Sequence, residues 1–222
     1  MKHEQSLADL FNKYIAGKAQ ELEVGFHSFS LDGQDRDAGA DYVLTDAHQF
    51  SLIEFKYAEI DLKSEARKPR RLELCNALLW ETRMRDLHDR CHYVAWKGGA
   101  TVYVNIYRAE VCNRAVFGTA CDLPHEGPNR ETSIKAREFA DDFLTTGNRS
   151  LALLEFEEYL NWLLNTSGST RASVELLTYD ANEFELVLVR FPSVGDAYQW
   201  FQDRRQHRHT LPHVPRPPRP RM

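Results

Sequence analysis

Two carboxylates and one amine stand in a short segment whose pattern predicts that they meet in the folded chain. Asp41 begins one apolar run, and Glu54 and Lys56 belong to the next. β-Branched and aromatic residues dominate both runs, at about 40–45 and 50–57, and a polar stretch separates them. This pattern is typical of a β-hairpin. We therefore expect two adjacent strands that carry the three charged groups.

The expected register of this hairpin places the three groups on one face of the sheet. Pairing of Thr45 with Phe50 puts Asp41 directly opposite Glu54, with Cβ atoms about 5 Å apart. Side chains alternate along a strand, so Lys56 shares the face of Glu54. Two carboxylates this close raise each other's pKa unless a cation lies between them. The pattern therefore indicates a divalent metal ion, with the lysine beside it to stabilise an anion or orient water.

The arrangement resembles the PD-(D/E)xK nuclease superfamily. Asp41 matches the Asp of that motif, Glu54 its second acidic position and Lys56 its Lys, whereas Ala40 stands where the motif's name has Pro. The resemblance implies a restriction-endonuclease-like fold and hydrolysis of phosphodiester bonds with Mg²⁺ or Mn²⁺. It also implies that Asp41, Glu54 and the main-chain carbonyl of Phe55 bind the metal, and that the lysine assists the attacking water.

Many superfamily members complete the metal shell with a glutamate from the first helix, and three glutamates are candidates here. Glu4 lies at the start of the expected helix, and Glu21 and Glu23 lie beyond its end. We favour Glu21 by its distance from Asp41. Many members also carry a glutamine in the helix after the ExK strand, but no glutamine occurs between positions 49 and 199. The motif lysine is then the only group expected to position the nucleophile.

The order of elements around the triplet follows that of the nuclease core. Apolar residues at helical spacing predict a helix over 5–18, and near-alternation predicts a strand over 23–30. After the hairpin, an apolar stripe predicts a single helix over 69–89. Two further strands, 92–96 and 101–107, flank a Gly-Gly turn. The expected class is α/β (α+β), with a core of helix, three strands, helix and two strands.

The rest of the chain is expected to pack on this core as an extension. The core covers residues 1–120 and the α/β extension covers 121–205. Within the extension, periodicity predicts two helices, a hairpin and a last short helix, at 131–144, 150–164, 173–191 and 196–205. Residues 206–222 are rich in Pro and Arg and lack core formers, so this tail is expected to be disordered.

Charge constrains how such a protein would hold nucleic acid. The net charge is −5, and six arginines from position 204 onward leave the rest with 22 basic and 33 acidic residues, or −11. A partner subunit, either a second copy or another protein, would then help to grip DNA. A basic cluster could contact phosphates that flank the cut site, although a solvated helix start explains it equally well. The cluster comprises Lys63, Arg67, Lys68, Arg70 and Arg71.

Composition places the chain among soluble globular proteins. It has 222 residues, of which 42% are hydrophobic and 27% are charged. No apolar run approaches a membrane span, and the first residues lead into an amphipathic segment, so we expect a cytoplasmic protein without a membrane partner. Four cysteines without a CxxC pair are expected to be reduced thiols rather than zinc ligands: Cys75, Cys91, Cys112 and Cys121.

Other chemistries lack a starting point in this sequence. It contains no P-loop, GxGxxG, GxSxG or HExxH motif. His88 and His92 are four residues apart, but the expected change from helix to strand between them would separate their rings. We interpret them as ordinary surface or interface histidines. The preferred function is a Mg²⁺-dependent nuclease that acts on DNA. One alternative is a non-catalytic module of the same fold that binds nucleic acid or protein. Another is an unrelated α+β interaction protein with a coincidental order of elements. The triplet itself could also be an ordinary salt bridge on an exposed sheet face.

Overall fold

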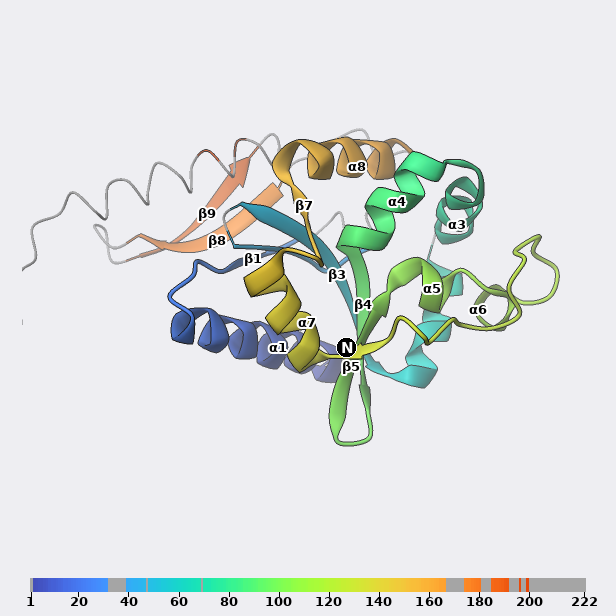
Figure 1. The fold of residues 1–222 in the computed structure, drawn as a ribbon, viewed down its shortest axis with the longest axis horizontal. Helices are drawn as coiled ribbons and strands as arrows, with labels where there is room; N and C mark the ends of the chain where they lie inside the picture. Colours follow the sequence, from blue (N-terminus) through green and yellow to red (C-terminus); the bar gives the residue numbers. More distant parts are fainter. Residues whose placement is uncertain are drawn as a thin grey trace, which may run out of the picture.

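The computed structural model shows a mixed α/β fold in which helices cover both faces of a central sheet (Figure 1). The structure describes residues 2–31, 39–46, 48–68, 70–166, 174–180 and 185–191, together with Asp196 and Gln199. The expected helix 196–205 and the tail 206–222 lie outside these residues, except for positions 196 and 199. Within the described ranges, none of the helices has the length and apolar character required to span a bilayer.

The central sheet has seven strands in the order β1-β2-β3-β4-β5-β6, with β7 paired to the start of β3. Only β3 and β4 run parallel among these pairs. The strands are β1 (His27–Ser30), β2 (Tyr42–Thr45), β3 (Gln49–Ala58), β4 (His92–Gly98), β5 (Thr101–Ile106), β6 (Ile134–Lys135) and β7 (Leu151–Ala152). A separate hairpin joins β8 (Val174–Asp180) to β9 (Glu185–Phe191), as the sequence predicts.

Two layers of helices cover the sheet. The helices are α1 (Lys2–Glu21), the 3₁₀ helix η1 (Glu59–Arg67), α3 (Arg71–Trp80), α4 (Thr82–Cys91), α5 (Tyr107–Val111), α6 (Arg114–Phe117), α7 (Ala136–Asp141), the π-helix η2 (Asp142–Thr146) and α8 (Leu153–Thr166). Helices α1 and α7 lie against one face, and α3, α4 and α8 lie against the other (Figure 1). The two faces bury separate apolar clusters.

Helix α1 follows from the spacing of its apolar residues. Leu7, Phe11, Ile15 and Ala19 recur every four residues, so they form one stripe that packs on the sheet and is buried. Leu10 belongs to the same amphipathic pattern, but it is 66% exposed because it lies on the outer edge of the helix. The helix is longer than the predicted 5–18 at both ends, since it begins at Lys2 and ends at Glu21.

The hairpin register is confirmed. Thr45 pairs with Phe50 and Tyr42 pairs with Ile53. Along β3, Phe50 and Leu52 face the cluster under α3, α4 and α8, while Ile53 and Phe55 face the cluster under α1. This alternation places the next even-numbered side chains of β3 on the face that carries α3 and α4.

The single helix predicted over 69–89 is wrong. The chain instead forms two helices, α3 and α4, which Glu81 separates with a non-helical conformation at φ −90° and ψ 83°. Leu74 and Leu78 before the break pack in the same buried cluster as Leu87 and Cys91 after it. Because the apolar stripe continues across the break, sequence periodicity could not reveal it.

Residues beyond 120 complete the core rather than forming a separate unit. The helix expected over 131–144 is divided into β6, α7 and η2, and the helix expected over 150–164 begins with β7 before α8. Strand β6 extends the sheet at β5, and β7 pairs with β3. Phe139 and Phe143 fill the cluster under α1, and Phe156 fills the opposite one. Described elements on both sides of residue 120 therefore share one sheet and the same two apolar clusters.

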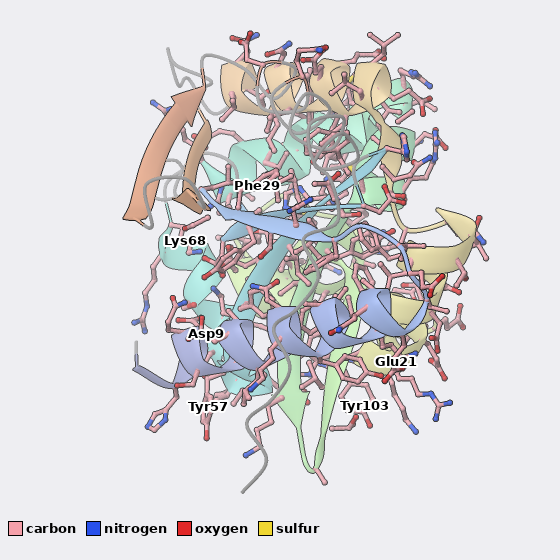
Figure 2. All side chains as sticks on the ribbon, turned by 90° about the vertical axis from the view of Figure 1, so that its left-hand side faces the viewer. Asp9, Glu21, Phe29, Tyr57, Lys68 and Tyr103 are labelled. Carbon is pink, nitrogen blue, oxygen red and sulfur yellow. A yellow bond between two sulfur atoms is a disulfide. The ribbon has the colours of Figure 1, made fainter. Side chains whose placement is uncertain are left out.

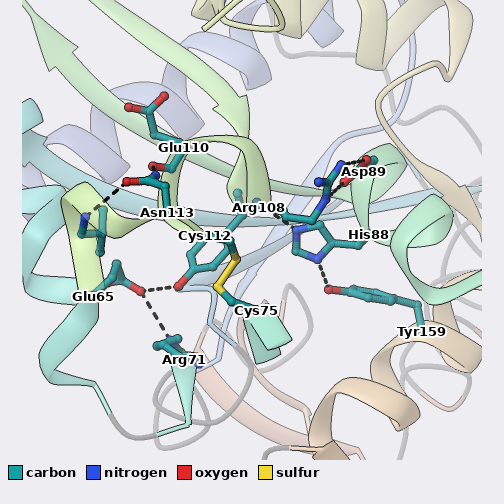
Figure 3. The surroundings of a disulfide bond; sticks show 12 residues. Glu65, Arg71, Cys75, His88, Asp89, Arg108, Glu110, Cys112, Asn113 and Tyr159 are labelled. Atoms are coloured by element: carbon teal, nitrogen blue, oxygen red, sulfur yellow. Dashed lines mark hydrogen bonds and ion pairs between the residues drawn. A yellow bond between two sulfur atoms is a disulfide. The ribbon is translucent and has the colours of Figure 1, made fainter. Parts of the chain in front are cut away.

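The expectation of reduced cysteines is wrong for one pair. Cys75 of α3 and Cys112, directly after α5, form a disulfide across 37 residues of sequence. Cys91 is a buried free thiol and Cys121 is a free thiol of intermediate exposure. The disulfide ties two helices that both contact the charged cluster described below (Figure 3).

Candidate active site

Asp41 is held beside strand β3 by two main-chain contacts. Its N–H donates to the Ile53 carbonyl at 2.9 Å, which extends the β2–β3 ladder by one residue. Its Oδ2 accepts a hydrogen bond from the Phe55 N–H at 2.7 Å. The ladder therefore places Asp41 opposite Glu54, as predicted. The geometry fixes the carboxylate against the strand that carries the other two groups of the motif.

Two buried glutamates share two ammonium groups at the centre of the site. Glu54 Oε1 contacts the Lys56 ammonium and lies 2.5 Å from Lys68 Nζ. Glu65 Oε1 lies 2.9 Å from Lys56 Nζ and 3.1 Å from Lys68 Nζ. The Glu54, Glu65 and Lys56 side chains are almost completely buried, whereas 24% of the Lys68 side chain is exposed. The triplet is therefore not an exposed surface salt bridge.

The Lys56 ammonium is surrounded by oxygen atoms from three elements. Besides the two glutamates, it lies 3.2 Å from the Phe55 carbonyl oxygen and 3.4 Å from Glu4 Oε1. Strand β3, helix η1 and helix α1 thus converge on one cation. An ammonium can donate three hydrogen bonds, so this cage exceeds what the lysine alone can satisfy.

Glu65 has two further partners besides the two lysines. The Tyr107 hydroxyl donates to Glu65 Oε2 at 2.6 Å, and Arg71 Nε lies 3.4 Å from the same oxygen (Figure 3). Arg71 is itself 1% exposed. Burial raises the pKa of Glu65, but the charges of Lys56 and Lys68 with these two partners outweigh it and lower the pKa to about 2. Glu65 is therefore ionised.

The two motif carboxyls hold protons more strongly than free carboxyls. Burial and the charge of Glu54 raise the pKa of Asp41 to about 7, against the opposing Phe55 N–H. Burial and the charge of Glu65 raise the pKa of Glu54, although Lys56 and Lys68 oppose them. Burial lowers the pKa of Lys56, but the neighbouring carboxylates outweigh it and keep the group cationic.

One oxygen of Glu54 has no hydrogen-bond donor among the described residues. Glu65 Oε1 also lacks a well-aligned hydrogen bond, but two ammonium groups lie 2.9 and 3.1 Å from it. Glu54 Oε2 is buried and accepts no hydrogen bond from any residue that the structure describes. A buried carboxylate oxygen without a donor is costly, so such atoms usually have a bound ion or water. Together with the Asp41 carboxylate, it offers the oxygen ligands that Mg²⁺ prefers. The chemistry of these two carboxyls therefore suits a divalent cation, but two groups are not a complete ligand set.

The described residues do not form a closed metal cage in their present arrangement. Among them, no group of three or more His, Cys, Asp or Glu side chains is placed to hold a metal ion. The Lys56 ammonium fills the space among Glu4, Glu54 and Glu65 instead. The Phe55 carbonyl also points at this ammonium. A metal would thus share its carboxylates with a lysine that already neutralises them.

The placement of helix α1 favours Glu4 over Glu21 as the additional glutamate. Glu4 reaches Lys56 from the first turn of the helix. Glu21 is the last residue of α1, about 25 Å further along the axis at 1.5 Å per residue. Figure 2 shows Glu21 at the end of α1 away from Lys68. The preference for Glu21 from sequence distance is therefore not supported.

The predicted basic cluster is split by the fold. Lys63, Arg67 and Arg70 are exposed and remain candidates for phosphate contacts. Lys68 instead turns into the site and contacts both buried glutamates. Arg71 is buried against Glu65, so it cannot meet nucleic acid on the surface, and its assignment to the interface is wrong.

Two histidines interpreted as surface residues are buried close to the site. The rings of His88 and His92 are 4.7 Å apart and both residues are fully buried. His88 lies in the last turn of α4 and His92 begins β4, and the His92 N–H still bonds to the His88 carbonyl. The helix passes directly into the strand, so the transition does not separate the rings.

Several groups that complete the site had little or no signal in the sequence. Glu65 and Lys68 are spaced i and i+3, which could have suggested a common helical face. The contact of Tyr107 with Glu65 spans 42 residues and has no local signal.

Comparisons with protein-family models, with curated proteins and with solved structures find no match to this chain.

Proposed function

We propose that this protein is a Mg²⁺-dependent nuclease of restriction-endonuclease-like fold that hydrolyses phosphodiester bonds, with DNA as its preferred substrate. The unpartnered Glu54 Oε2 beside Asp41 carries the proposal, because a cation at this position satisfies both carboxyls. Asp41 and Glu54 would hold Mg²⁺ or Mn²⁺, with Glu4 rather than Glu21 as the nearby third carboxylate. A bound Mg²⁺ supplies Lewis-acid polarisation of the phosphate and lowers the pKa of water.

The side chains of the site have separable roles in this reaction. Lys56 stays cationic, so it stabilises the negative charge that develops on the phosphate rather than accepting a proton. Glu65 lies 2.9 Å from the Lys56 ammonium and is itself fixed by Tyr107, so it helps to hold this lysine in place. Lys68 is the more exposed of the two lysines, so it is better placed to meet a phosphate that enters the site.

Access to the site is possible from the side of helix α1. The Glu4 side chain is 34% exposed, in contrast to the buried glutamates. Beside it lies a cavity of about 330 Å³ lined by His3, Glu4, Tyr57, Asp61 and Ser64. Exposed Lys63 and Arg67 project from η1, the helix that carries Asp61 and Ser64, and could contact flanking phosphates.

One observation favours the alternative of a non-catalytic module. Lys56 and Lys68 neutralise Glu54 and Glu65 without any metal, so the cluster can stand as a buried ion-pair network. In that case the charges would fix the positions of β3 and η1. The module would bind nucleic acid or protein through other surfaces.

Calorimetry with Mn²⁺ and a cleavage assay on a panel of DNA and RNA substrates separate the two functions. The nuclease binds Mn²⁺ at one site and cuts at least one substrate in Mg²⁺. Asp41→Ala removes both properties, whereas Lys13→Ala, at an exposed lysine of α1, keeps both. A purified chain that binds neither ion and cuts no substrate establishes the non-catalytic alternative.

The cytoplasmic localisation remains a proposal. The Cys75–Cys112 disulfide is of a kind that persists in oxidising compartments and is rare in reducing ones. Counting free thiols in protein isolated under alkylating conditions tests this directly. Two free thiols per chain indicate that the bond is present, and four indicate the reduced form expected in a cytoplasm.

A further inference from the structure

A buried chain of hydrogen bonds connects helix α8 to the segment that carries Asp41. The Arg108 N–H bonds to His88 Nε2 at 3.1 Å, and His88 Nδ1 lies 2.6 Å from the Tyr159 hydroxyl. The same hydroxyl lies 2.8 Å from His92 Nδ1, and His92 Nε2 lies 2.8 Å from the Gly39 carbonyl. The two histidines and the tyrosine are fully buried.

The partners at the two ends determine the direction of every hydrogen bond. Burial lowers the pKa of both histidines, that of His92 to about 3, so both rings are neutral. A main-chain N–H can only donate, so His88 Nε2 accepts and its Nδ1 carries the proton. A carbonyl can only accept, so His92 Nε2 carries the proton and its Nδ1 accepts. Tyr159 must therefore accept from His88 and donate to His92.

Gly39, whose carbonyl is the last acceptor in this series of hydrogen bonds, has a constrained backbone. Gly39 has φ +71°, a left-handed conformation that residues with a side chain rarely adopt. A Cβ at this position would lie 3.1 Å from an Arg71 guanidinium nitrogen. The Gly39 carbonyl accepts from His92, and two residues later the Asp41 N–H enters the sheet ladder. Asp41 itself is held by Ile53, Leu31 and Phe55, and the His92 bond adds a side-chain contact at Gly39, two residues earlier.

We infer that Tyr159 is a positioning residue for the site, acting through His92 and Gly39 to set the place of the Asp41 carboxylate. This inference rests on the proposed function. It assigns a role in the site to α8, which lies more than a hundred residues after Asp41 in the sequence. Outer groups that orient a metal ligand typically contribute 10- to 100-fold to metal affinity.

Tyr159→Phe tests this inference, because it removes one hydroxyl and leaves both His88 Nδ1 and His92 Nδ1 without a partner. Tyr93→Phe is the matched control. Tyr93 is a buried tyrosine whose hydroxyl donates to the Arg90 carbonyl at 2.8 Å, and it packs in the cluster on the other face of the sheet. Both variants lose one buried hydroxyl, but only one of them interrupts the chain.

The first measurement is amide hydrogen exchange of residues 39–46 in the full-length, metal-free protein. Tyr159→Phe should speed exchange at the Asp41 amide about tenfold relative to the amides of β2, and Tyr93→Phe should not. Equal exchange of this segment in the wild type and Tyr159→Phe would overturn the inference. This readout needs neither metal nor activity, so it is independent of the proposed nuclease function.

The second measurement is Mn²⁺ affinity by calorimetry. Tyr159→Phe should raise the dissociation constant 10- to 100-fold, while Tyr93→Phe should leave it within twofold. Unchanged affinity with faster exchange would overturn the positioning role. A wild type that binds no Mn²⁺ would overturn the proposed function, and the role in the site would fall with it.

If Tyr159→Phe does not fold, a second pair of variants tests whether the His92 hydrogen bond to Gly39 holds the Asp41 segment. His92→Gln retains an N–H that can reach the Gly39 carbonyl, whereas His92→Leu does not. The inference expects faster exchange at Asp41 in His92→Leu than in His92→Gln. Equal exchange in the two variants would contradict it.

Discussion

Glu54 and Glu110 are both buried glutamates in contact with cations, yet their oxygens are used differently. Glu110 Oε1 accepts from Arg130 Nη2 at 2.8 Å and Nε at 3.2 Å, and its Oε2 accepts from Asn105 at 2.9 Å. Both oxygens of this carboxylate are satisfied. Glu54 directs Oε1 at two ammonium groups and leaves Oε2 without a partner among the described residues.

The difference separates a structural ion pair from an incomplete site. A buried carboxylate that serves stability alone gains most when all its lone pairs are satisfied. Glu110 meets this condition and joins β5 to the loop that carries Arg130. Glu54 does not meet it, although two lysines are close enough to have satisfied both oxygens. We interpret its free oxygen and the raised pKa of Asp41, in line with the proposed function, as a place for a ligand.

The largest effect should come from neutralising the incomplete site. Glu54→Gln should lower the cleavage rate by more than about 10³, because a neutral amide binds Mg²⁺ weakly and removes a charge from the site. Glu110→Gln, which makes the same chemical change at the satisfied carboxylate, should cleave at nearly the wild-type rate. Steady-state assays of both variants test the comparison, and equal losses would show that Glu54 is no more than structural.

The next largest effect should come from Lys56. Lys56→Met keeps most of the apolar stem and removes the ammonium, so cleavage should fall about 10²- to 10³-fold. Mn²⁺ affinity should stay the same or increase, because Glu54 loses a competing cation. Lys13→Met, at an exposed lysine of α1, serves as the control for both assays. A loss of Mn²⁺ binding in Lys56→Met would contradict the distinction between ligand and charge stabiliser.

The free energy of unfolding should also depend on pH through Asp41, the partner of Glu54 in the proposed site. The pKa of Asp41 is raised to about 7 in the fold, so the native state holds a proton that the unfolded chain releases near pH 4. Metal-free stability should therefore fall as pH rises from about 4 to 7. Asp41→Asn can keep the Phe55 hydrogen bond without the charge, so it should be more stable at pH 8 by about 2–4 kcal/mol.

Denaturant unfolding at pH 4 and pH 8 measures this difference, which should nearly vanish at the lower pH. Mn²⁺ affinity of the wild type should increase from pH 6 to pH 8, because binding displaces the proton on Asp41. A wild type whose stability is the same at both pH values, relative to Asp41→Asn, would show that Asp41 is not perturbed.

The smallest effect should appear at Glu110. Glu110→Gln should lower the free energy of unfolding by about 1–3 kcal/mol, since the amide cannot accept from Arg130 and Asn105 with both of its ends. The Arg130 side chain is 42% exposed and already lies 2.9 Å from Glu59 Oε1, which limits the cost. Chemical denaturation checks the value. A gain in stability would mean that this pair, too, is kept for a purpose other than folding.

Local sequence was sufficient to bring the motif together. Side chains alternate along a strand and a short hairpin loop fixes the register, so Asp41, Glu54 and Lys56 could be placed on one face before the structure was known. The same local rules gave helix α1 and the strands β2 to β5 within a few residues. They failed at Glu81, because an apolar stripe continues unchanged through a break between two helices.

Only the tertiary structure decided which groups surround the motif. The spacing of Glu4 and Glu21 along α1 does not say which end of the helix meets β3, since that depends on how the helix packs. Arg71 lies inside the protein against Glu65, and this burial depends on the packing of the whole fold. The Cys75–Cys112 bond and the Tyr159–His92 contact join residues 37 and 67 positions apart. Such contacts follow from packing of the two layers, for which a single sequence carries no local periodicity.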